Sequence, residues 1–241
     1  MDRPRRRRTG VTPGTDEPRF PGYDVMAQLK TWDAETTAVV VRRLAGSDQG
    51  PRFFSTQEEP AARALLDCLL AQFEEPRVPV FEAIDARLAD GQGDGYHYAD
   101  LPRDPPAWRM SLQALDAAAD ESRGVRFHQL ERDAQRDLVE TVRLTDGDWR
   151  GLPAQHLFKL WLRYACASFY AHPWAWNEIG FGGPAYPRGY KHLALNNREP
   201  WEAAERDALD PVPWLDRAEG AKKRHAEGLS GQIPADQLGT P

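Results

Sequence analysis

The sequence is poor in cysteine and has no long apolar run. Its 241 residues include 2 cysteines, Cys68 and Cys166, without a CxxC pair, which excludes a disulfide-dense scaffold and a zinc site built from four thiolates. No apolar run approaches the roughly 20 residues that a membrane-spanning helix needs, and the mean hydropathy is -0.67. We therefore expect no direct membrane insertion.

The chain also lacks a surplus of basic residues. Lys and Arg number 31 against 37 Asp and Glu, so the formal net charge is -6. Nucleic-acid binders need an excess of Lys and Arg on one face to contact phosphates, and we expect no nucleic-acid partner. Aromatic residues make up 10% of the chain, which is typical of a folded protein and not of a disordered one.

Both ends of the chain are polar and rich in Pro, Gly and charge. Residues 3–8 hold five arginines, as in a twin-arginine export leader, but the apolar stretch that such a leader requires does not follow. We predict a disordered tail over residues 1–22, a single helical domain over 23–215 and a flexible tail over 216–241. We expect a cytoplasmic protein, with a periplasmic location or export with a partner as the alternative.

Apolar spacing between the tails is helical almost everywhere, and strand-like alternation hardly occurs. The fold class predicted is all-α, an irregular helical bundle with a long Gly/Pro/aromatic loop. A first helix is expected over 33–44, with Gly46 as its stop. Ser55 and Glu58 have the spacing of a capping box, which predicts the start of a second helix that must end before Pro76. A third is expected over 80–88.

The second half of the bundle follows a long turn-rich stretch. Residues 91–106 are expected to form a surface loop, after which helical spacing resumes at Trp108 and again at Leu130. The strongest helix begins at Pro153, a favoured first position, and carries apolar residues on nearly every side as far as Phe169. Such a helix belongs in the middle of a bundle or beneath another chain.

The most unusual stretch of the sequence comes next, and we call residues 171–190 the aromatic segment. It combines Trp, Phe and Tyr with Gly and Pro. Gly permits backbone shapes closed to other residues, Pro fixes φ, and the rings offer apolar area at little entropic cost. The composition favours a rigid loop that binds another protein, or a set of rings that plug the end of the bundle.

Candidate reactive groups are sparse. Gly180, Gly182 and Ala185 match the G-x-G-x-x-A form of a dinucleotide fingerprint, but that motif needs a strand before it and a helix after it. Cys166 with His172 and Glu178 could be arranged for nucleophilic catalysis, although a thiol on the most apolar helix favours a buried, inert cysteine. We predict no catalytic, cofactor-binding or metal-binding residue in this chain.

A sugar-binding role is the alternative. His97 lies between Tyr96 and Tyr98 in the 91–106 loop, and rings from this loop and from the aromatic segment could stack on a pyranose. In this reading the chain is a stand-alone sugar-binding protein or enzyme with a carbohydrate pocket.

Two motifs resemble the gluconate 2-dehydrogenase subunit 3 family. The first is Phe-Phe-[Ser/Thr]-x-x-Glu before a helix, found here at Phe53 to Glu58. The second, more specific motif is Phe-Tyr-x-x-Pro followed by Gly-[Phe/Tyr]-x-Gly-Pro-x-Tyr-Pro, found here from Phe169 to Pro187. The resemblance covers a family-like core over roughly 53–190.

The resemblance implies a helical small subunit without a cofactor of its own. Such subunits clasp a flavin-containing catalytic subunit of the glucose-methanol-choline class and serve its maturation. It implies that this chain is a non-catalytic accessory subunit, with no activity alone, of an FAD-dependent sugar or polyol dehydrogenase, and that FAD is held by the partner. The expected partner-binding residues all lie in the aromatic segment: Trp174, Trp176, Asn177, Gly180, Phe181, Gly183, Pro184, Tyr186, Pro187 and Tyr190.

Overall fold

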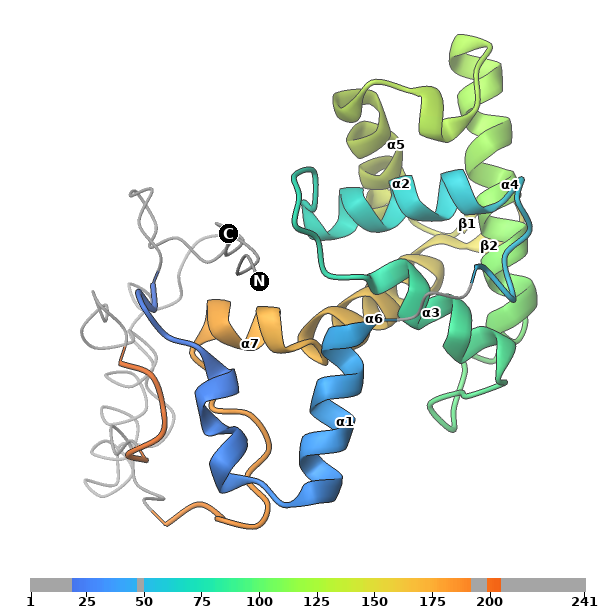
Figure 1. Cartoon of the computed structure of the whole chain (residues 1–241). Coiled ribbons are helices and arrows are strands. Elements are labelled where there is room, and N and C mark those ends of the chain that lie inside the picture. Colours follow the sequence, from blue (N-terminus) through green and yellow to red (C-terminus); the bar gives the residue numbers. More distant parts are fainter. Residues whose placement is uncertain (1–18, 47–49, 192–198, 205–241) are drawn as a thin grey trace, which may run out of the picture. The chain divides into compact units, whose positions relative to one another are not determined.

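The computed structural model describes residues 19–46, 50–191 and 199–204. These ranges contain seven α-helices, two short 3-10 helices and one antiparallel pair of two-residue strands (Figure 1), which confirms the all-α prediction. No helix within them is long and apolar enough to span a membrane. In chain order the elements are η1 (Val25–Thr31), α1 (Ala34–Ala45), α2 (Glu59–Leu70), α3 (Val80–Ala89), α4 (Asp104–Arg123), η2 (Phe127–Gln129), α5 (Arg132–Leu144), β1 (Asp148–Trp149), β2 (Leu152–Pro153), α6 (Ala154–Tyr170) and α7 (Pro173–Ile179).

The chain divides into two units, Met1–Ala204 and Glu205–Pro241. The described residues all belong to the first unit. The predicted C-terminal tail over 216–241 and most of the predicted N-terminal tail lie outside the described residues. The limits proposed for the helical domain therefore stay a prediction.

The predicted start signals of α1 and α2 are present as hydrogen bonds. Asp33 caps α1, because the backbone N–H of Thr36 donates to its Oδ1 at 2.8 Å, and Gly46 follows the last turn. At the capping box, the Ser55 N–H donates to Glu58 Oε2 at 2.9 Å and the Glu58 N–H donates to Ser55 Oγ at 3.3 Å. This pair forms the turn directly before α2 and satisfies N–H groups that a helix start leaves without partners.

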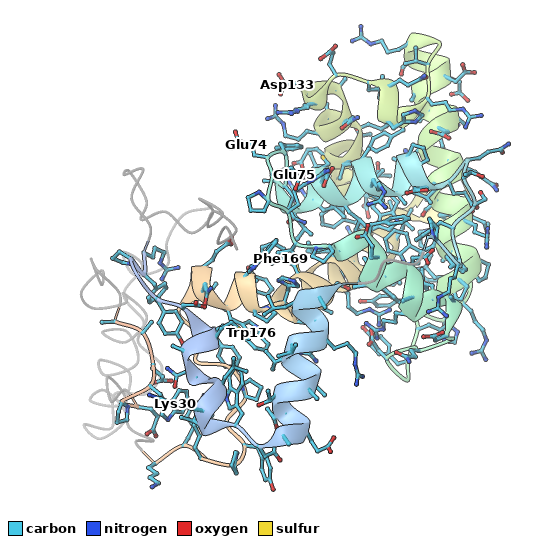
Figure 2. All side chains as sticks on the ribbon, in the orientation of Figure 1. Lys30, Glu74, Glu75, Asp133, Phe169 and Trp176 are labelled. Carbon is cyan, nitrogen blue, oxygen red and sulfur yellow. The ribbon has the colours of Figure 1, made fainter. Side chains whose placement is uncertain are left out.

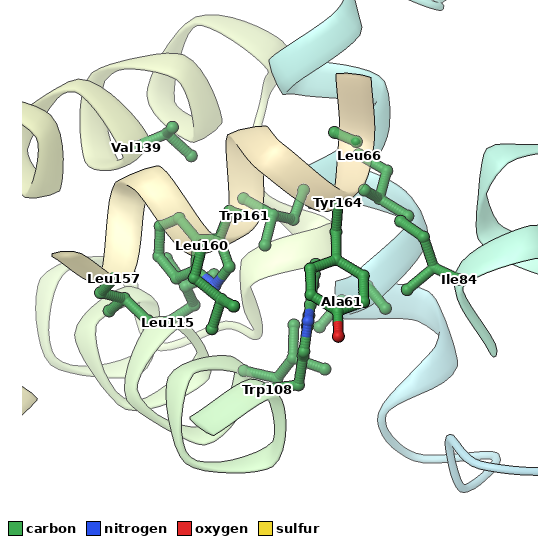
Figure 3. Packing of buried hydrophobic residues seen from close by; sticks show 14 of the residues in the cluster. Ala61, Leu66, Ile84, Trp108, Leu115, Val139, Leu157, Leu160, Trp161 and Tyr164 are labelled. Carbon is green, nitrogen blue, oxygen red and sulfur yellow. The ribbon is translucent and has the colours of Figure 1, made fainter. Parts of the chain in front are cut away.

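Helix α6 is the centre of the main core. It packs against α2, α3, α4 and α5, and Trp161 and Tyr164 on it are fully buried (Figure 3). The Trp161 Nε1–H donates to Ser111 Oγ at 3.0 Å, and the Tyr164 ring meets Trp108 edge-on at 5.8 Å between centroids. Burial of each large apolar side chain contributes about 2 to 3 kcal/mol. The predicted central place of this helix is confirmed.

A buried carboxylate attaches the segment before α2 to α3. Asp85 on α3 is 4% exposed and accepts backbone N–H groups from Arg52 at 2.7 Å, Phe53 at 2.9 Å and Phe54 at 2.9 Å. Several N–H donors compensate a buried carboxylate for the water that it loses. The Phe53-Phe54 pair is thereby fixed, and the Phe54 ring packs in the main core.

Two local predictions differ from the structure, and one further element has no sequence-based prediction. Helix α4 begins at Asp104, inside the predicted 91–106 loop, because Pro105 and Pro106 occupy the first turn, where a missing N–H costs nothing. Residues 173–179 form helix α7, whereas the Gly and Pro content of the aromatic segment predicts a loop over its whole length. The 3-10 helix η1 precedes α1 and was not predicted.

Candidate functional site

The aromatic segment begins with helix α7, whose two ends are well defined. His172 caps its start, where the Trp174 N–H donates to His172 Nδ1 at 3.2 Å, and Pro173 takes the first position. Gly180 ends it with φ of +69°, and the Phe181 N–H returns to the Trp176 carbonyl at 2.9 Å. A left-handed glycine closed by such a bond is a common helix stop. The first half of the segment is therefore regular structure.

Helix α7 packs on the chain's own N-terminal elements, η1 and α1. Trp176 is 3% exposed and forms a second apolar cluster with Val25, Trp32 and Val40, and Figure 2 shows it facing these elements. The Trp176 Nε1–H donates to the Tyr170 carbonyl at 2.6 Å. Asn177 joins the same contact, because its Oδ1 accepts the Val25 N–H at 2.7 Å.

At three glycines of the aromatic segment, a ring from another part of the chain occupies the space that a side chain would need. A Cβ built on Gly180 would lie closer than 3.0 Å to the Phe20 ring, and one on Gly183 would lie equally close to Trp32. Gly182 has the same relation to Trp201. Only a residue without a side chain permits such an approach. These glycines therefore receive aromatic side chains of this chain.

The outer side of the aromatic segment carries exposed rings. Tyr186 is 67% exposed, Tyr190 43% and Phe181 38%. Tyr170 and Ile179, at the ends of α6 and α7, are also largely exposed. Exposed aromatic rings on a backbone packed from behind are characteristic of protein-binding surfaces. We call Phe181, Tyr186 and Tyr190 the exposed ring set.

The ten residues predicted to bind a partner fall into three groups. Two are buried within the chain, four are half-buried and four are exposed. The buried ones are Trp176 and Gly183; the half-buried ones are Trp174, Asn177, Gly180 and Pro184; the exposed ones are Phe181, Tyr186, Pro187 and Tyr190. In this structure the exposed group can touch a second chain directly, whereas the buried pair supports the backbone beneath it. Their role in partner binding stays a prediction.

The loop that precedes α4 has neighbours of its own. Asp94 forms ion pairs with Arg87 on α3 and, at 3.3 Å, with Arg163 on α6. Tyr98 stacks on His156 of α6, with centroids 3.9 Å apart. The aromatic segment instead contacts η1, α1, Tyr170 at the end of α6, and Trp201. The loop therefore packs beside His156 and Arg163 of α6, whereas the aromatic segment packs at the far end of the same helix, beside Tyr170.

Both cysteines, His156 and His172 have environments that a structural role explains. Burial raises the pKa of both the Cys68 and the Cys166 thiol, which disfavours the reactive thiolate. His156 Nδ1 lies 2.8 Å from a carboxylate oxygen of Asp100, and His172 caps α7. Across the described ranges, no three His, Cys, Asp or Glu side chains are grouped to hold a metal ion.

These features define a class of protein: an all-α chain with one central helix and a surface of exposed rings on a braced aromatic segment. A model of the family described as gluconate 2-dehydrogenase subunit 3 matches residues 56–183, which is more than half of the 241 residues. The chain belongs to this family, and the resemblance drawn from its two motifs is confirmed. Comparisons with curated proteins and with solved structures give no match.

The family match also locates the supporting residues. It ends at residue 183, so it contains α7 and the glycines that receive Phe20 and Trp32. The elements η1 and α1, which cover α7, lie before its first residue. The exposed Tyr186 and Tyr190 lie after its last. The surface is thus shared between the family-matched region and the segments that flank it.

Proposed function

We propose that this chain is a non-catalytic accessory subunit that binds and stabilises, or helps to mature, an FAD-dependent sugar or polyol dehydrogenase of the glucose-methanol-choline class. Family membership supports a role as a subunit of a dehydrogenase. The observation that carries the proposal is the exposed ring set on a backbone that η1, α1 and three internal rings fix from behind.

Two physical properties suit this surface to stable association. Tyrosine and phenylalanine bring large contact area with few rotatable bonds, and such residues carry most of the binding energy at many interfaces. A surface that is already ordered loses little conformational entropy when a partner arrives. Tyr186 and Tyr190 lie on such a backbone, so their apolar area can contribute to affinity with little ordering cost.

We propose that the flavin is bound by the partner. Gly180, Gly182 and Ala185 follow a helix, and the space next to the two glycines is filled by the rings of Phe20 and Trp201. A dinucleotide fingerprint needs that space for the close approach of a pyrophosphate at the start of a helix. The residues present therefore do not fit FAD at this motif.

Co-expression tests the proposal directly. The flavin-dependent dehydrogenase encoded beside this chain is produced with and without it, and flavin content, activity and co-purification are measured. We expect the dehydrogenase to co-purify with the chain and to lose flavin occupancy or activity when produced alone. A dehydrogenase that is fully flavinated and active alone, and that does not bind the chain, would overturn the proposal.

A paired variant then tests the surface. Tyr186→Ala with Tyr190→Ala removes two exposed rings, so the chain should keep its stability while affinity for the dehydrogenase falls at least about thirtyfold, or about 2 kcal/mol. Leu144→Ala is the matched control, because Leu144 is 66% exposed on α5. Affinity should be unchanged in this control. Equal affinity for all three proteins would place the interface elsewhere.

A further inference from the structure

Arg188 lies between Tyr186 and Tyr190 in the sequence, and its guanidinium is bound within the chain. Its Nη1 donates to Gln28 Oε1 at 3.2 Å and to Thr31 Oγ1 at 3.0 Å, both on η1. Its Nη2 donates to the carbonyl of Gly182 at 2.5 Å and to that of Pro184 at 3.2 Å. One side chain thus connects the N-terminal 3-10 helix to the turn that precedes the two tyrosines.

An aromatic ring covers the same guanidinium. The Trp201 ring centroid lies 3.7 Å from Arg188 Cζ and 5.1 Å from the ring centroid of Tyr190. The Trp201 ring is also the one that approaches Gly182. A guanidinium over an indole gains cation–π attraction, which is larger when water is excluded. Trp201 therefore helps to hold Arg188 in place.

We propose that Arg188 is the positioning residue of the partner-binding surface, holding Tyr186 and Tyr190 in their binding geometry before the partner arrives. This inference rests on the proposed function. Arg188 acts through the two tyrosines, because both of its terminal nitrogens are bonded to η1 and to the 182–184 turn and its Nε is buried. Without these bonds the described backbone from Gly182 to Tyr190 keeps one internal backbone hydrogen bond, from the Gly189 N–H to the Ala185 carbonyl.

The planar shape of arginine is needed at this position. Four acceptors on two separate segments receive hydrogen bonds from the two terminal nitrogens, while the flat face of the same group stacks on Trp201. A lysine has one nitrogen on a flexible stem and cannot bond both segments and stack at the same time. Arg188→Lys should therefore behave more like Arg188→Met than like the natural chain.

The experiment compares Arg188→Met, Arg188→Lys and Gln28→Met in the full chain. Affinity for the flavin-containing dehydrogenase is measured by calorimetry, and amide hydrogen exchange is followed over residues 182–190. We expect Arg188→Met to weaken binding about tenfold or more, since the tyrosines must then be ordered during binding. We also expect faster exchange over 182–190 with unchanged exchange in α2 to α6. Gln28→Met, which removes an acceptor far from the tyrosines in sequence, should weaken binding less.

A double variant separates positioning from general damage. If Arg188 acts through its bond to Gln28, then Arg188→Met with Gln28→Met should bind no worse than Arg188→Met alone. Arg150→Met is the matched control, because Arg150 also lies over a tryptophan, Trp149 at 6.0 Å, and pairs with Glu121. This control should bind as the natural chain does.

The outcomes distinguish this inference from the proposed function. If the natural chain binds and Arg188→Met binds equally well, the positioning role is wrong and the proposed function stands. If Arg188→Met leaves amide exchange over 182–190 unchanged, then Arg188 does not hold this backbone in place, and the inference is wrong whatever the affinity. If the natural chain does not bind the dehydrogenase, the proposed function fails and this inference fails with it.

Discussion

Acidification should destabilise the fold through His172, the residue that caps α7. Its side chain is 5% exposed, and burial, together with the charge of Arg43, lowers the pKa of His172 to about 4, although a backbone hydrogen bond with Arg43 opposes the shift. Its Nδ1 accepts the Trp174 N–H at 3.2 Å. Protonation at Nδ1 would put two donors face to face and leave a charge in a buried site.

The sign and size of the effect follow from this pKa. In the unfolded chain the imidazole titrates near its ordinary value of 6.5, so between pH 6.5 and about 4 the unfolded chain binds more protons than the folded one. The contribution of neutral His172 to the unfolding free energy is therefore fully present above pH 6.5 and is lost as the pH is lowered to about 4. The difference between the two pKa values corresponds to about 3 kcal/mol.

Urea denaturation at several pH values between 7 and 4 measures this loss for the natural chain and for His172→Asn. Asparagine can cap a helix and does not titrate, so subtracting the two curves removes the contribution of the carboxylates. The difference in unfolding free energy should shrink by about 3 kcal/mol from pH 7 to pH 4. His97→Asn, at an exposed loop histidine, should follow the natural chain. A difference for His172→Asn that does not vary with pH would refute the reasoning.

Two further substitutions test the packing directly. Gly183→Ala should lower the unfolding free energy by about 2 to 5 kcal/mol, because residue 183 has positive φ and the new Cβ would overlap Trp32. Gly189→Ala is the control, because Gly189 has a similar φ but open space around it, and it should lower the unfolding free energy by about 1 kcal/mol. Equal losses in the two variants would contradict the close approach of Trp32 to Gly183. Asp85→Asn should cost about 1 to 3 kcal/mol in thermal or urea unfolding, since an amide nitrogen then faces an N–H of residues 52–54, and an unchanged midpoint would argue against that anchor.

The regular helices could be predicted because their signals are local. Asp33 and Gly46 mark the ends of α1, and the apolar residues of α6 occur at helical spacing over its whole length. The aromatic segment was harder, because its Gly and Pro content favours a loop. Its His172-Pro173 start and Gly180 stop, which are ordinary helix boundaries, would have indicated α7.

The surface itself could be predicted only in part. Tyr186 and Tyr190 stand out from the sequence, and the structure leaves both exposed. Trp176 and Gly183 also stood out, but they pack against Trp32, which lies about 150 residues earlier in the chain. No spacing rule links such distant positions. For the same reason the contacts of Arg188 with η1 and Trp201 could not be found before the chain was folded.

The cover that η1 and α1 place over α7 has a consequence for any shortened version of this protein. The family match begins at residue 56, so trimming to the matched region would remove Val25, Trp32 and Val40. Trp176 would then be exposed to water on the side that these residues now cover. The Trp32 ring that packs against Gly183 would also be missing. Such a fragment would expose a new apolar patch that favours self-association. A pull-down performed with it would detect binding to that patch and not to the natural surface.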